Sequence, residues 1–137
     1  MKFKTIEHTA DIGIEVEAST LGELFAGAAF AMFSLVVDPR EVEQVETREL
    51  SLEAGDYEEL LFMWLNELLL MLDAEGLLLS GFEVKMVDEH GLAAHVRGEK
   101  LDPGRHRIEE EIKAATYHEM LVERGGEGWR ARVIFDV

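Results

Sequence analysis

Asp11-Ile12-Gly13-Ile14-Glu15-Val16-Glu17-Ala18-Ser19-Thr20-Leu21-Gly22-Glu23 changes its hydrophobic period in the middle of the stretch. Apolar and polar residues alternate as far as Ala18, which is typical of a strand that is buried on one face. Thr20 and Glu23 then have the spacing of a capping box, in which each residue satisfies a free backbone N–H at the start of a helix. The stretch therefore predicts a half-buried strand that leads directly into a helix.

Two helices are predicted in the first half of the chain. The first starts after Thr20, follows apolar residues at helical spacing and ends before Asp38-Pro39, because proline disfavours helix in the residue before it. The second starts after Asp56, carries a wide leucine-rich stripe and ends at Gly76, a plausible left-handed C-terminal residue. Between them, residues 42–54 read as a strand whose alternation shifts phase near Arg48, which suggests a bulge.

The second half of the chain reads as strands. Residues 82–86 and 92–96 alternate on either side of a turn at 89–91, and a loop is expected at 102–104. Residues 115–124 and 129–136 flank a glycine-rich hairpin loop. With 137 residues, we expect one domain over 1–137. The order of elements predicts an α+β fold of two layers, a largely antiparallel sheet with two helices packed on one face.

Composition excludes several classes of function. The formal net charge is −16, so the chain should be repelled by phosphate backbones and should not bind nucleic acid strongly. It contains no cysteine, which fits a reducing cytoplasm and rules out thiolate metal sites. Met1-Lys2-Phe3-Lys4-Thr5 lacks the apolar run of a signal peptide, and the most apolar window is interrupted by Asn66 and Glu67, so no membrane role is expected.

Acidic groups stand at both ends of the chain. The last strand ends on Asp136 and the α-carboxylate of Val137, and Asp11 opens the first alternating strand. If the apolar residues of both strands face the helices, Asp11 and Asp136 point to the opposite face of the sheet. Two side-chain carboxylates and a terminal carboxylate suit a hard cation such as Ca²⁺ or Mg²⁺. The alternative is that these are unrelated surface anions at strand ends.

Two further residues are candidates for a supporting role. His8 stands three residues before Asp11 and can orient it, although such a histidine is more often a satisfied, partly buried residue. Lys113 can contact a phosphate or a partner, or simply form a solvated ion pair. The histidines lack the spacing of a zinc site, and no sequence motif for nucleotide hydrolysis, dinucleotide binding or a serine hydrolase is present.

Five segments together resemble the archease family. They are Glu7-His8-Thr9-Ala10-Asp11-Ile12-Gly13, Leu65-Asn66-Glu67-Leu68-Leu69, Glu99-Lys100-Leu101-Asp102, Lys113-Ala114-Ala115-Thr116-Tyr117-His118, and Arg130-Ala131-Arg132-Val133-Ile134-Phe135-Asp136-Val137. The resemblance runs essentially from end to end, and these segments show no departure from the family's pattern.

The resemblance implies an accessory protein and not an enzyme. Archeases assist the RtcB-type tRNA-splicing ligase, which joins exon halves using GTP and its own divalent metal, by accelerating formation of the ligase–GMP intermediate and supporting multiple turnover. The family's metal site corresponds to Asp11, Asp136 and the carboxylate of Val137, and Lys113 matches a position important for activity. The alternatives are a metal-dependent enzyme acting on a small phosphorylated or acidic substrate, and a chaperone-like or methyltransferase-modulating scaffold.

Overall fold

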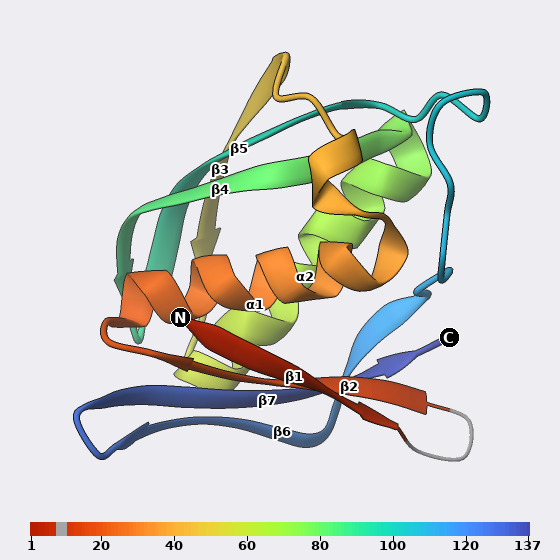
Figure 1. Cartoon of the computed structure of the whole chain (residues 1–137). Coiled ribbons are helices and arrows are strands. Elements are labelled where there is room, and N and C mark those ends of the chain that lie inside the picture. Colours follow the sequence, from red (N-terminus) through yellow and green to blue (C-terminus); the bar gives the residue numbers. More distant parts are fainter. Residues whose placement is uncertain (8–10) are drawn as a thin grey trace.

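The strands divide between two antiparallel sheets, with both helices between them (Figure 1). The structure is a computed structural model that describes residues 1–7 and 11–137. Its elements in chain order are β1 (Lys2–Glu7), β2 (Asp11–Ala18), α1 (Leu21–Val36), the short 3₁₀ helix η1 (Pro39–Glu41), β3 (Glu46–Glu53), α2 (Tyr57–Glu75), β4 (Leu77–Asp88), β5 (Gly91–Lys100), β6 (Ala114–Gly125) and β7 (Gly128–Asp136).

The four-stranded sheet has the order β1-β2-β7-β6, and the three-stranded sheet has the order β3-β5-β4. Helix α1 packs against β2 on one side and β4 on the other, whereas α2 packs mainly against β6. Burial of apolar area by both helices drives this arrangement. At its centre Trp64 of α2 is fully buried, and its indole N–H donates a hydrogen bond to the carbonyl of Phe25 in α1 at 2.9 Å.

The predicted helix ends are confirmed. Thr20 Oγ1 accepts a hydrogen bond from the N–H of Glu23 at 3.1 Å. At the start of α2, an Asp56 carboxylate oxygen accepts one from the N–H of Glu59 at 2.8 Å. Gly76 ends α2 with φ of 67°, the left-handed conformation that glycine adopts without a steric penalty.

The strand over 42–54 differs from its prediction. Strand β3 is shorter, Glu46–Glu53, and pairs with β5 without any shift in register, so the bulge predicted near Arg48 is wrong. The alternation is continuous, and Arg48 occupies one of the half-buried positions that alternate with exposed ones along the strand. Its guanidinium forms an ion pair with Glu75 at the end of α2 at 2.9 Å. A charged residue at a position where an apolar one was expected made the alternation of the sequence look shifted.

The expected α+β class, with two helices against antiparallel strands, is confirmed. The sequence did not indicate strand β1 or the separation of the strands into two sheets. For the site, the important consequence is that one face of the four-stranded sheet, which we call the outer face, points away from both helices (Figure 1). No helix in the described parts of the chain combines the length and the apolar character needed to cross a membrane.

Candidate metal centre

Asp11 and Asp136 lie directly opposite each other in the four-stranded sheet. Asp11 is the first residue of β2 and Asp136 the last of β7, and the antiparallel register pairs them with each other. Residues of the same strands that point to the opposite side of the sheet, such as Ile14 and Val133, are fully buried against the helices. The two acids therefore occupy adjacent positions on the outer face, as parity predicts, where paired Cβ atoms are separated by about 5 Å.

Two opposed acids repel each other when both are ionised, because like charges at directly opposed positions of a sheet are unfavourable. Of the arginines of β7 on the same face, Arg130 pairs with Glu123. Arg132 lies 3.9 Å from both Glu15 and Glu119, and its Nε is buried without a hydrogen-bond partner among the described residues. A cation bound between the two acids would offset their repulsion.

Lys113 stands beside this pair. It directly precedes β6, whose first residue, Ala114, is aligned with Asp136. The backbone N–H of Lys113 donates a hydrogen bond to the carbonyl of Asp136 at 2.8 Å, and the residue is exposed. Three candidate residues that are far apart in the sequence, Asp11, Lys113 and Asp136, are therefore neighbours across three adjacent strands.

The donors present suit a hard cation, although the side chains alone form an incomplete set. Asp11 and Asp136 supply oxygen ligands of the kind that Ca²⁺ and Mg²⁺ take. The described residues contain no group of three or more His, Cys, Asp or Glu side chains arranged to hold a metal ion. The remaining anionic ligand expected from the sequence is the carboxylate of Val137, which is a main-chain group. His8 lies outside the described residues.

An apolar row of Ile6, Gly13 and Ile134 lies beside the acid pair on the outer face, and the sequence alone did not indicate it. Ile134 is only 1% exposed although it faces away from the helices. A Cβ added to Gly13, the residue paired with it, would stand 2.7 Å from Ile134 Cδ1, 2.9 Å from the carbonyl oxygen of Val133 and 3.6 Å from Ile6 Cβ. The missing side chain of Gly13 lets the two isoleucines close over the strand. The glycine within an alternating strand was the available signal.

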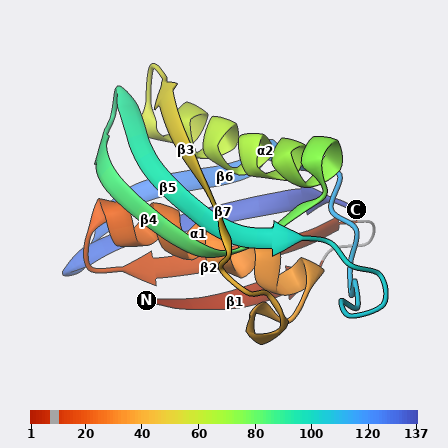
Figure 2. The same cartoon turned by 90° about the horizontal axis from the view of Figure 1, so that it is seen from above.

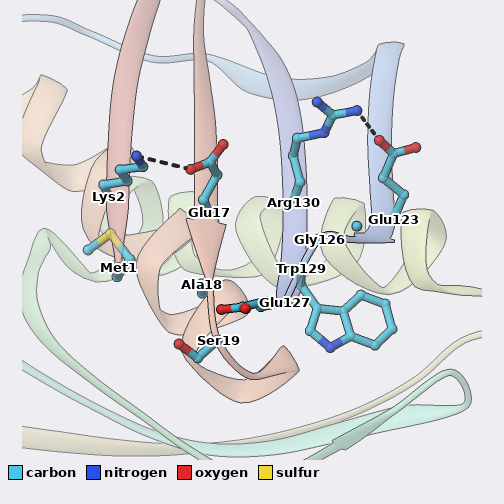
Figure 3. A pocket seen from close by; sticks show the side chains of 12 residues that line it. Met1, Lys2, Glu17, Ala18, Ser19, Glu123, Gly126, Glu127, Trp129 and Arg130 are labelled. Carbon is cyan, nitrogen blue, oxygen red and sulfur yellow. Dashed lines mark hydrogen bonds and ion pairs between the residues drawn. The ribbon is translucent and has the colours of Figure 1, made fainter.

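A cavity lies at the other end of the same sheet (Figure 3). It has a volume of about 780 Å³ and is lined by residues of β1, β2, β6, β7 and the β6–β7 turn, with Trp129 among them. Two pairs of its charged side chains neutralise each other, since Lys2 lies 3.5 Å from Glu17 and Arg130 pairs with Glu123. A single acid in the lining, Glu127, remains without an ion pair among the described residues. One acid offers fewer oxygen ligands than two opposed acids, so the acid pair is the better candidate for a cation.

The loop that leads to Lys113 is anchored by two buried polar residues, Glu99 and His106, and by the exposed Arg105. The Glu99 carboxylate accepts hydrogen bonds from the N–H of Glu43 and from Arg105, and lies 3.3 Å from His106 Nε2. His106 Nδ1 accepts one from the N–H of Asp102 at 2.9 Å. Burial opposes ionisation of Glu99 most strongly, but the hydrogen bonds together outweigh it and hold the pKa of its carboxyl below the usual value.

Known proteins are similar to this chain over nearly its whole length. The model of the Archease protein family matches residues 3–137. An archease of Pyrococcus abyssi is 44% identical, with 99% of each chain covered, and an archease of Methanopyrus kandleri is 42% identical, with both chains fully covered.

Solved structures agree with this assignment. The solution structure of Methanobacterium thermoautotrophicum protein 1598 superposes with a TM-score of 0.86 at 36% identity, covering 98% of each chain. A crystal structure from Thermotoga maritima, described as an archease and possible chaperone, has a TM-score of 0.66 at 26% identity and covers 100% of this chain and 98% of its own. The chain belongs to the archease family.

Proposed function

We propose that this chain is a protein cofactor of tRNA splicing that activates an RtcB-type RNA ligase. It promotes formation of the ligase–GMP intermediate and multiple turnover, and it holds a divalent cation, Ca²⁺ or Mg²⁺, at Asp11, Asp136 and the carboxylate of Val137. The observation that carries the proposal is the direct pairing of Asp11 with Asp136, with Lys113 beside Asp136. Membership of the archease family supports it from a second side.

The residues of the chain have distinct roles in this proposal. Asp11 and Asp136 fix the position of the cation on the rigid end of two paired strands, and Val137 completes its charge. When bound, the cation supplies positive charge that can orient phosphate oxygens of GTP. Lys113, directly before the neighbouring strand β6, adds a compact positive charge that is proposed to contact the same phosphates. His8 is proposed to orient Asp11.

The acidic surface favours action on the ligase and not on RNA. With a formal charge of −16, the chain gains nothing from the phosphate contacts that dominate nucleic-acid affinity. A protein partner in the cytoplasm that already holds RNA and GTP removes the need for this chain to bind either tightly.

A single-turnover guanylylation assay tests the proposal. An RtcB-type ligase is mixed with GTP and a substoichiometric amount of the chain, and the ligase–GMP adduct is followed over time. We expect faster adduct formation, and more ligation cycles per ligase in a parallel reaction that also contains the RNA ends to be joined. The chain alone should show neither ligation nor GTP hydrolysis. Robust GTP hydrolysis by the chain alone, with no effect on the ligase, would support the metal-dependent enzyme instead.

A chaperone-like function is the second candidate, because the relative from Thermotoga maritima is described as a possible chaperone. That function does not need the acid pair. Prevention of aggregation by both the wild-type chain and Asp11→Ala, without any effect on guanylylation, would favour it.

A further inference from the structure

Strand β6 is an edge strand whose open side is covered by a helix. It forms one edge of the four-stranded sheet, and an uncovered edge leaves backbone N–H and C=O groups unpaired. Helix α2 runs alongside it (Figure 2). Three side chains of α2, Glu58, Phe62 and Asn66, contact β6, and their spacing of four residues places them on one face of the helix.

The side chain of Asn66 makes the backbone hydrogen bonds that a neighbouring strand would otherwise make. Its Oδ1 accepts a hydrogen bond from the N–H of Ala115 at 2.9 Å, and its Nδ2 donates to the carbonyl of Ala115 at 3.1 Å and to that of Phe62 at 3.0 Å. Ala115 is only 2% exposed, so water cannot readily replace this partner. Loss of the amide would leave two buried backbone groups of the same residue unsatisfied.

The other two contacts cover the rest of the edge. Phe62 stacks on Tyr117 with ring centroids 4.0 Å apart and planes inclined by 8°. At the far end, Glu58 Oε1 accepts a hydrogen bond from the N–H of Val122 at 3.2 Å. Between them, the register of β6 with β7 shifts from Thr116 to Leu121, and Glu119 takes a φ of 53°. Strand β6 is therefore held less continuously by β7 than a regular strand, and depends more on α2.

We infer that Asn66 is a positioning residue of the candidate site: by fastening Ala115, it fixes the start of β6 and holds Lys113 against Asp136. Only Ala114 separates the fastened residue from Lys113, whose N–H bonds the carbonyl of Asp136. This inference rests on the proposed function for the role of Lys113. The mechanical part, the link from Asn66 to the Lys113 amide, stands on the contacts alone.

Glu58 provides a matched control for Asn66. Both residues belong to α2, and both bond the backbone of β6 through a side chain. Glu58, however, bonds Val122, which lies nine positions from Lys113 along the chain. A general loss of stability should follow removal of either contact, whereas displacement of Lys113 should follow only from removal of Asn66.

The experiment compares Asn66→Ala, Glu58→Ala, Lys113→Ala and the Asn66→Ala/Lys113→Ala double variant. Amide hydrogen exchange read by NMR should be about tenfold faster or more at Lys113 and Ala115 in Asn66→Ala, whereas Glu58→Ala should speed exchange at Val122 and leave Lys113 unchanged. Ligase activation should fall about tenfold in Asn66→Ala and stay within about twofold of wild type in Glu58→Ala. Asn66→Ala should cause no further loss in the Lys113→Ala background.

Two results would overturn the inference: unchanged exchange at Lys113 in Asn66→Ala, or an undiminished effect of Asn66→Ala in the absence of the lysine side chain. If Asn66→Ala does not fold, the isosteric Asn66→Asp tests the same contact, because it faces the Ala115 carbonyl with an oxygen in place of an N–H donor. If the wild-type chain activates no RtcB-type ligase, the proposed function fails, and exchange at Lys113 still decides whether Asn66 positions it.

Discussion

Asp11 and Asp136 bring two like charges to directly opposed positions of the four-stranded sheet. Each is the terminal residue of its strand, and the register sets them against each other. Neither side chain fills space in the core, because both project from the face without helices. Opposed acids that add no packing are a feature that the proposed cation would explain, because it would offset their mutual repulsion.

Asp11→Ala should abolish binding of Ca²⁺ or Mg²⁺ and activation of the ligase, yet leave the fold intact. The change removes one of two opposed charges and leaves no cavity, so the free energy of unfolding should shift by about 0.5 kcal/mol or less. Calorimetric titration with each cation and urea unfolding measure the two effects. Asp73→Asn, which alters an exposed acid on α2, is the control. Full activation by Asp11→Ala would rule out the assignment of the site.

Gly13→Ala should destabilise the protein although it adds a single methyl group. The new Cβ would stand 2.7 Å from Ile134 Cδ1 and 2.9 Å from the backbone oxygen of Val133. The side chain can move but the backbone oxygen cannot without shifting β7, so overpacking should cost about 1–3 kcal/mol. Urea unfolding checks this, with Gly55→Ala as the control because a Cβ there meets nothing within 4 Å. Equal free energies of unfolding for the two variants would show that Ile134 and the backbone of β7 accommodate the added methyl group without strain.

At the scale of elements, the connection between β5 and β6 links the two sheets. It leaves the three-stranded sheet after Lys100, passes the buried Glu99–His106 pair and enters the four-stranded sheet at Ala114. Its N–H groups bond other elements along the way, from Glu109 to Val36 at the end of α1 and from Lys113 to Asp136. A segment without regular structure is thereby given a defined path that ends at the candidate site.

Glu99 should make the stability of the protein depend on pH in the acid range. Because its pKa is lowered in the folded state, its stabilising contribution is complete above the ordinary carboxyl pKa of about 4.3 and declines as the pH falls towards and through the lowered value. Wild type should therefore exceed Glu99→Gln in unfolding free energy at pH 7, and the difference should shrink towards pH 3. Urea unfolding across this range measures it, and a difference independent of pH would contradict the assignment.

The sequence predicted individual elements better than their assembly. Helix ends followed from local chemistry at Thr20, Asp56 and Gly76, and the outward direction of Asp11 and Asp136 followed from parity alone. The division into two sheets did not follow, because strand partners are chosen by tertiary packing that local patterns do not encode. The burial of Ile134 was missed for the same reason, since Ile6, which lies on the other side of Gly13, belongs to a strand that lacks clear alternation.

For the whole molecule, the distribution of charge matters more than its sum. The outer face carries ion pairs that alternate in sign across the strands, such as Lys4 with Glu15 at 3.1 Å and Lys2 with Glu17. In contrast, α2 contains five acidic residues, Glu58, Glu59, Glu67, Asp73 and Glu75, and no basic one. If the chain activates a ligase as proposed, contact through the outer face would bring a surface of paired charges to the partner and keep the acidic surface of α2 away from RNA phosphates.

The two ends of the described chain should respond differently to extension. The N-terminal amine lies 2.9 Å from Glu23 in α1, and Lys2 is paired with Glu17, so β1 begins at the end of the sheet away from Asp11 (Figure 1). Val137 instead follows directly after Asp136. If the Val137 carboxylate is a ligand, adding Gly-Ser after Val137 converts it to a neutral amide carbonyl and removes one of three anionic ligands. The number of anionic ligands is a main determinant of Ca²⁺ affinity.

The C-terminal extension should therefore weaken cation binding at least tenfold and reduce ligase activation, whereas the same pair added before Met1 should change neither. Calorimetric titration of Ca²⁺ and Mg²⁺ into both variants, followed by the guanylylation assay, makes the comparison at constant composition. Because the two variants are isomeric, a difference between them reports the position of the added residues. Equal affinity in both would remove Val137 from the site and leave Asp11 and Asp136 to hold the cation with water.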